Sequence, residues 1–253
     1  MKKLLLYVLP VSACLLFTTF CGGDDDVIEV KPVSKLEYTV TEDGDGVILT
    51  WCIAADFEPD EYVISVDSVD AGTTQNKYYT LYAPGALIEV FSVKNGERSR
   101  ATSISLAAKE TPSLEVWGTK DTDPNHPYWF GFDKDGTAYN YSGDPSPSWD
   151  MDFFVDDSLW LVSPYEYDPP IYNYIAVVEG TYEEVKIVPS PGYRLQKELV
   201  QGRVYGLRID RASFMEPTRF HYAKLYVEAI SGDKVTLKIA YQTIPRLHWV
   251  AVD

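Results

Sequence analysis

The chain has 253 residues, of which 45% are apolar and 24% are charged, and this composition is typical of globular proteins rather than of collagen, coiled coils or disordered chains. The formal net charge is −16, and it becomes −18 once an N-terminal segment holding Lys2 and Lys3 is removed. Because binding to a phosphate backbone needs clustered positive charge, nucleic acid is not expected as a partner.

The first expected element is a signal peptide over residues 1–20. Lys2 and Lys3 form a basic region, and the apolar run Leu4–Phe17 follows them. This run is shorter than the roughly 20 apolar residues that a membrane-spanning helix needs, and three aspartates at 24–26 come soon after it. The pattern therefore favours a cleaved leader over a retained transmembrane anchor.

The segment that follows the leader is Cys21-Gly22-Gly23-Asp24-Asp25-Asp26. It resembles the mature start of Bacteroidetes-type surface lipoproteins, in which a lipidated Cys precedes an acidic stretch associated with export. The resemblance implies lipidation at Cys21, an acidic tether over residues 21–32, and an outer-membrane location facing the cell exterior. Cys14 is the alternative lipidation site, because Phe20 stands before Cys21 where a small residue is usual. Several acyl chains would hold a soluble domain at the membrane, since each buried methylene contributes roughly 0.8 kcal/mol.

The rest of the sequence predicts an all-β chain. Short β-branched and aromatic runs are separated by Gly, Pro, Asn and Asp, and no long window has the periodicity of an amphipathic helix. One helical turn is expected at Leu195–Val200, followed by Gly202. In a first domain, residues 33–108, the expected strands are Val33–Tyr38, Val47–Ile53, Glu61–Val66, Lys77–Leu81, Ala86–Val93 and Ser99–Ala107. Strands at this spacing predict a β-sandwich.

This first domain resembles a fibronectin type III domain. The resemblance rests on Trp51 in the second strand, Tyr62 in the third, Pro84-Gly85 before the segment that matches the sixth strand of such a domain, and a turn at Asn95-Gly96. It implies a two-sheet antiparallel sandwich. Cys52 is expected to be a buried residue of its strand, because unpaired cysteine is among the most buried residue types.

A linker is expected over residues 109–113, and a second, larger antiparallel β domain over residues 114–253. Hairpin turns are expected at residues 133–136 and 231–234, because Gly and Asp accept the positive φ that such turns demand. The expected strands are Ser113–Thr119, Tyr128–Phe132, Thr137–Tyr141, Trp149–Val155, Ser158–Val162, Tyr172–Val178, Val185–Val188, Arg203–Ile209, Tyr222–Ser231, Lys234–Tyr241 and Leu247–Val252.

The second domain also looks like the HmuY-like lipoproteins, an all-β family that includes haem binders with two histidine ligands. The landmarks of this resemblance are residues 128–136, 149–153, 203–208, 222–225, 235–237 and 240–242. A haem-binding member would place a His just after the Trp149-Asp150 motif, where this chain has Phe154. His126 and His221 are therefore the axial candidates if haem is the ligand, because two imidazoles give a chemically sensible six-coordinate iron.

Charge and aromatic residues are distributed unevenly in the second domain. Residues 121–168 hold eleven acidic side chains against one basic one, whereas residues 186–224 hold eight basic and three acidic side chains. One interpretation is that the two halves of a sandwich present complementary faces. The other is a stacking surface for a flat ligand such as a sugar ring or a porphyrin. The candidate ligand-binding residues are Tyr139, Tyr141, Trp160, Tyr165 and Tyr167.

Two pairs of aspartates are considered for calcium binding and for glycoside hydrolysis. Asp133 and Asp135 lack the remaining ligands of a calcium loop, and a turn explains them better. Asp150 and Asp152 are the one pair considered for glycoside hydrolysis, but their spacing is common by chance. We therefore expect no catalytic residue, metal or cofactor. The expected function is that of a non-catalytic surface lipoprotein that binds glycan or protein through its C-terminal domain, and the alternative is haem capture.

Overall fold

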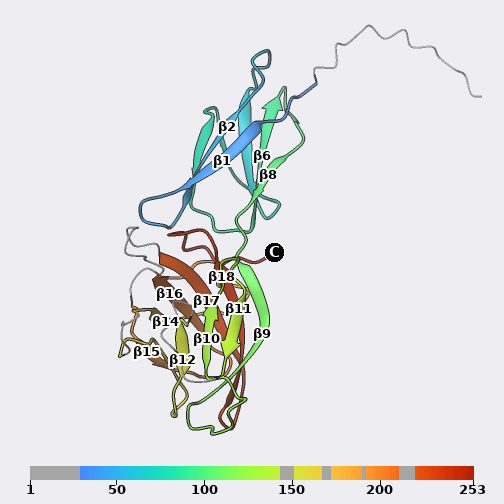
Figure 1. The fold of residues 1–253 in the computed structure, drawn as a ribbon. Coiled ribbons are helices and arrows are strands. Elements are labelled where there is room, and N and C mark those ends of the chain that lie inside the picture. The colour runs from blue at the N-terminus through green and yellow to red at the C-terminus, as the bar shows by residue number, and fades with distance from the viewer. Residues whose placement is uncertain (1–28, 143–150, 167–171, 190–191, 211–219) are drawn as a thin grey trace, which may run out of the picture.

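The computed structural model describes residues 29–142, 151–166, 172–189, 192–210 and 220–253. These residues form eighteen β-strands in four antiparallel sheets and no helix, which confirms the all-β class. The strands fall into a first unit, with strands β1 to β8, and a second unit, with strands β9 to β18 (Figure 1). Across the described residues, no helix is long and apolar enough to cross a bilayer.

The first unit is built from two sheets whose inner faces share one core. Strand β2 shows why these residues form a sandwich: Val47, Leu49 and Trp51 are buried, and the residues between them are exposed. One sheet has the order β1 (Ser34–Val40), β2 (Val47–Cys52), β5 (Tyr78–Leu81). The other has the order β4 (Val69–Thr74), β3 (Glu61–Val66), β6 (Leu87–Lys94), β7 (Glu97–Arg98), and β8 (Thr102–Ser105) also pairs with β6.

Two features of the first unit differ from the sequence expectation. Cys52 is exposed, because the alternation that buries Trp51 turns the next side chain outward. Strand β4 was not expected from the sequence. It contains Asp70 and Gly72, and both residue types are depleted in strands, so the segment has a low β-propensity. The turn at Asn95-Gly96 is as expected, with φ values of 54° and 81°.

The second unit is also a pair of sheets, and its core lies between them. Phe130 and Phe153 from one sheet and Leu207 and Leu225 from the other are all fully buried. The first of these sheets has the order β11 (Ala138–Tyr141), β10 (Trp129–Phe132), β12 (Phe153–Val155), β13 (Trp160–Val162), β15 (Gln196–Glu198). The second has the order β14 (Tyr174–Val178), β16 (Val204–Asp210), β17 (Phe220–Ser231), β18 (Lys234–Gln242), β9 (Lys109–Trp117).

Residues 109–113 are not a linker. They are the first half of β9, where Lys109 pairs with Tyr241 and Thr111 pairs with Ile239 of β18. Pro112 made this segment read as a break, but it lies on an edge strand at a shift of register, where a missing N–H costs no ladder bond. The helical turn expected at Leu195–Val200 is wrong as well, because that segment contains β15.

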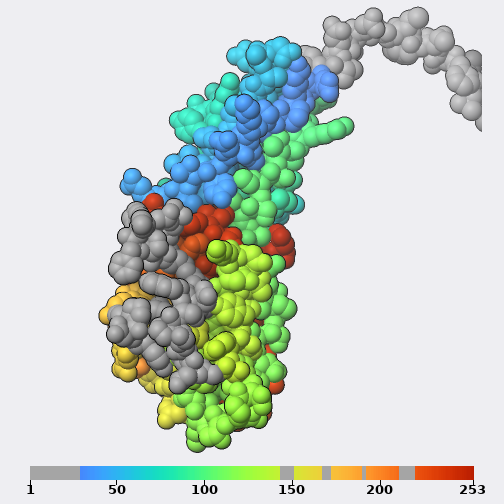
Figure 2. All heavy atoms as spheres, viewed as in Figure 1, coloured from blue at the N-terminus to red at the C-terminus, as the bar shows by residue number. Residues whose placement is uncertain are grey.

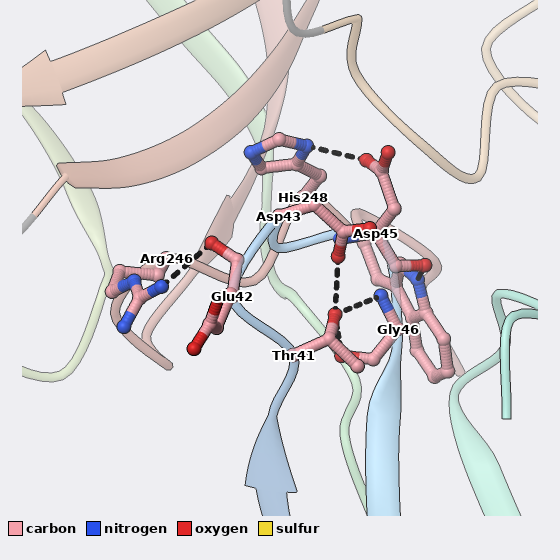
Figure 3. Close-up of polar contacts among 8 residues, drawn as sticks. Thr41, Glu42, Asp43, Asp45, Gly46, Arg246 and His248 are labelled. Atoms are coloured by element: carbon pink, nitrogen blue, oxygen red, sulfur yellow. Dashed lines mark hydrogen bonds and ion pairs between the residues drawn. The ribbon is translucent and has the colours of Figure 1, made fainter. Parts of the chain in front are cut away.

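The C-terminal segment returns to the first unit and joins the two units. Leu247 and Trp249 are fully buried in the first unit's core, and Figure 2 shows the red end of the chain between the two units. At the β1–β2 turn, His248 Nδ1 lies 2.8 Å from Asp45 Oδ1, and Arg246 donates to the carbonyl oxygen of Glu42 at 2.7 Å (Figure 3). The first unit is therefore completed by residues from the far end of the chain.

Candidate functional site

A cleft of about 780 Å³ lies at the edge of the second unit where strands β14 and β15 meet. We call it the edge cleft. Its aromatic lining is Trp160, Tyr165, Tyr174 and Tyr193. Its charged lining is Arg194, Lys197, Glu198 and Arg203. The cleft is thus rich in aromatic rings and carries more positive than negative groups, in a chain whose net charge is −16.

The cleft exists because one segment crosses between the two sheets. Ile175 and Arg194 exchange two backbone hydrogen bonds, of 2.7 and 2.8 Å, which tie the segment to β14. Four residues later, Glu198 pairs with Trp160 of β13 in the other sheet. The hydroxyl of buried Tyr205 donates to the carbonyl oxygen of Glu198 at 2.7 Å, so that the crossing segment is held from the core.

Arg208 fixes two of the tyrosine rings. Its guanidinium carbon lies 4.3 Å from the ring centre of Tyr174, 5.3 Å from that of Tyr193 and 4.6 Å from that of Phe220. Such cation–π contacts are stabilising, more so when they are partly desolvated. Within the described residues, the Tyr193 hydroxyl and Arg208 Nε are buried atoms without a hydrogen-bond partner. Burial also raises the pKa of Tyr193 well above its ordinary value, so that the hydroxyl stays protonated.

The structure brings together only part of the predicted binding set. Trp160 and Tyr165 line the edge cleft, where a hydrogen bond with Glu166 raises the pKa of Tyr165. Tyr141 lines a separate hollow of about 390 Å³ beside Trp117, and Tyr139 is a half-buried residue of β11 outside both sites. Tyr167 lies outside the described residues.

Tyr174, Tyr193 and the cleft cations were not among the predicted binding residues. The cations belong to the basic stretch 186–224, so charge imbalance was the available signal. Nothing in the sequence indicates that this basic stretch would cross beside Trp160 and Tyr165, because β13 and β15 are separated by more than thirty residues along the chain.

The two candidate haem histidines lie far apart. His126 stacks on Trp117, which pairs with Lys234 of β18, whereas His221 stacks on Tyr241, seven residues further along the same strand. That separation corresponds to about 23 Å at 3.3 Å per strand residue. These two imidazoles therefore do not form an axial pair in this fold.

The acidic candidates have structural roles where they are described. Asp152 is buried and accepts hydrogen bonds from the Phe132 amide at 3.1 Å and from Asn173 Nδ2 at 3.2 Å. Asp150 lies outside the described residues. Asp133 and Asp135 accept hydrogen bonds from amides of their own turn, and the contacts with Thr137 lower the pKa of Asp135 to about 2. Among the described residues, no group of three His, Cys, Asp or Glu side chains could hold a metal ion.

Cys21, the expected lipidation site, and the alternative Cys14 lie outside the described residues. The edge cleft is the larger of the two hollows described in the second unit, and it holds two of the expected binding residues, Trp160 and Tyr165. Comparison of the chain with protein-family models, with curated proteins and with solved structures found no match.

Proposed function

We propose that this protein is a non-catalytic lipoprotein that is anchored at Cys21 and binds an extracellular ligand in the edge cleft. The observation that carries the proposal is the convergence of four aromatic rings, from Trp160, Tyr165, Tyr174 and Tyr193, in one hollow. Aromatic side chains left partly open in a concave site are a common feature of ligand-binding surfaces. The rings are also held in place before any ligand arrives, because Arg208 packs against two of them.

The arrangement of the two units fits a tethered receptor. The described chain enters at the end of the first unit that lies away from the second unit (Figure 1). The first unit therefore stands between the proposed anchor and the edge cleft, as a spacer would. Its two sheets, with three strands in one and β6 at the centre of the other, support the resemblance to a fibronectin type III domain.

The anchor is tested on protein purified from the native membrane. Mass spectrometry of the N-terminal peptide should find a chain that begins at an acylated Cys21. An unmodified residue 21, or a mature chain that starts at Cys14, would contradict this assignment.

The binding role is tested with the full mature chain on a panel of neutral and acidic polysaccharides and of host extracellular proteins. We expect saturable binding to at least one of them, and Trp160→Ala should weaken it at least about tenfold, because stacked aromatic residues dominate binding energies. Tyr78→Ala is the matched control, since Tyr78 is 55% exposed in the first unit and distant from the cleft in sequence and fold. Equal losses in both variants, or no saturable ligand, would refute the proposal.

A further inference from the structure

The edge cleft gathers three basic side chains, from Arg194, Lys197 and Arg203, in one hollow. Lys186 and Lys238 each form an ion pair, with Asp67 at 2.9 Å and Glu110 at 3.4 Å. In contrast, Arg194, Lys197 and Arg203 form no ion pair with a carboxylate of any described residue, although Glu198 lies in the same cleft. Three cations that have no carboxylate partner among the described residues of this acidic protein attract an anionic ligand.

These cations lie beside the ring faces. Arg194, Lys197 and Tyr193 belong to one crossing segment, and Arg203 and Trp160 line the same hollow. A ligand that places a negative group on a guanidinium and an apolar face on an aromatic ring would use both features at once.

The backbone at this edge favours a sugar chain over an acidic peptide. Extended peptides commonly bind by adding a strand to a free sheet edge. Here Ile175 and Arg194 already use their backbone groups on each other, which interrupts the edge of β14, whereas β15 is the end strand of its sheet and is the edge at which a peptide competitor is tested below. From Arg194 to Glu198 the crossing segment reaches at most about 13 Å, a length that a few sugar units lying along the rings can cover.

We infer that the edge cleft binds an acidic polysaccharide, whose uronate carboxylates pair with Arg194, Lys197 and Arg203 while its sugar rings stack on Trp160 and Tyr174. This inference rests on the proposed ligand-binding function and names its ligand class. Binding should weaken as salt rises, because exposed ion pairs are screened over a distance of about 8 Å in physiological salt.

The test uses the full mature chain and calorimetric titration with oligomers of galacturonate, mannuronate and chondroitin, together with the methyl ester of each uronate. The methyl esters keep the rings and remove the charges. We expect at least one acid to bind and its ester to bind at least about tenfold more weakly. Each single variant, Arg194→Gln, Lys197→Gln or Arg203→Gln, should weaken binding about threefold, and the triple variant at least about tenfold.

Arg100→Gln is the control variant, because it removes an exposed cation from the first unit and should leave binding unchanged. Thermal unfolding of the triple variant shows whether it is folded, and if it is not, the esters and the single variants still decide the question. Equal binding of acid and ester, or of a neutral polysaccharide, would overturn the inference and leave the proposed function standing. Preferential binding of poly-glutamate or hemin would also overturn it, and no ligand of any kind would overturn both.

Discussion

The indole Nε1 of Trp249 donates a hydrogen bond to the carbonyl oxygen of Asp45 at 3.0 Å, across 204 positions of the sequence. The indole is fully buried among first-unit residues such as Leu49 and Ile88. Next to it, Val188 donates to the carbonyl oxygen of His248 and Val250 donates to that of Lys186, so that the same segment is bonded to the second unit. Trp249 thus belongs to the second half of the chain and to the core of the first.

This position predicts a large loss of stability in Trp249→Ala. Truncating a buried Trp in a core costs about 3–5 kcal/mol of unfolding free energy. Urea unfolding, followed by circular dichroism, measures this cost. The control Tyr78→Ala should change the unfolding free energy by less than about 0.5 kcal/mol, because its side chain is largely exposed. A cost of under about 1 kcal/mol for Trp249→Ala would show that the first core does not need the C-terminal segment.

Substitutions at Gly44 and Gly96 distinguish the cost of backbone strain from the cost of contact with the C-terminal segment. Gly44 has φ +79°, and an added Cβ would lie 2.3 Å from the Arg246 carbonyl oxygen, whereas Gly96 has φ +81° and open space around it. Gly96→Ala should therefore cost only the strain of a left-handed residue, about 1–2 kcal/mol. Gly44→Ala should cost more, because the junction must also shift. Equal melting temperatures for the two variants would mean that the β1–β2 turn is not closely packed against the C-terminal segment.

Lys224 gives the stability of the second unit a specific pH dependence. Its ammonium is buried and donates to the carbonyl oxygens of Tyr182 and Val185 at 2.7 and 2.9 Å, and burial lowers the pKa of Lys224 to about 8. Between pH 8 and the ordinary value of 10.5, the unfolded chain holds a proton that the folded chain releases. The contribution of this group therefore makes the folded protein more stable as pH rises through that window.

The measurement is the unfolding free energy of the native protein minus that of Lys224→Met, taken from pH 7.5 to 9.5. We expect this difference to increase with pH by no more than about 1.4 kcal/mol per unit. Lys224→Met also leaves two carbonyl oxygens without their donor, but that loss is independent of pH. Lys120→Met, at an exposed position, should leave the slope unchanged. If this difference in unfolding free energy stayed constant or decreased with pH, burial would not have lowered the pKa of Lys224.

Strand β9 predicts protection against trypsin at Lys109. Its residues are bonded to β18, and proteases cut readily at exposed loop tips rather than within a paired ladder. Brief digestion of the native mature chain should therefore leave the bond after Lys109 intact. Early cleavage there, before exposed loops are cut, would mean that residues 109–113 behave as a linker after all.

Strands were predicted correctly from the sequence where local residue types alone favour a strand. Strand β3 lies at Glu61–Val66 as expected, and β2 differs from its prediction only at the C-terminal end. Both are rich in β-branched and aromatic residues, and β2 also alternates buried and exposed side chains. The domain boundary predicted at Pro112 was wrong. Whether a proline breaks a strand depends on its position in the pairing, and the shift of register with β18 at this point is not visible in the local sequence. β15 has only three residues, and it is a strand because it pairs with β13. The local sequence contains no signal for that pairing.

The candidate site was anticipated in part for the same reason. Trp160 and Tyr165 belong to an aromatic, acidic stretch that stood out in the sequence, and both line the edge cleft. Tyr174 and Tyr193 lie beyond that stretch and meet the others through sheet topology and contact with Arg208. Tyr141 faces a different hollow. Composition can thus indicate that a chain carries binding side chains, but convergence is a property of non-local pairing.

The most direct measurement of the central claim, that ligand binds in the edge cleft, is fluorine NMR of the mature protein labelled with 5-fluorotryptophan. The chain has six tryptophans, and Trp160→Phe and Trp117→Phe assign the two resonances that matter. On titration with the polysaccharide that binds best, the Trp160 resonance should shift in proportion to occupancy while that of Trp117, beside the other hollow, stays in place. A shift at Trp117 with none at Trp160 would contradict the account.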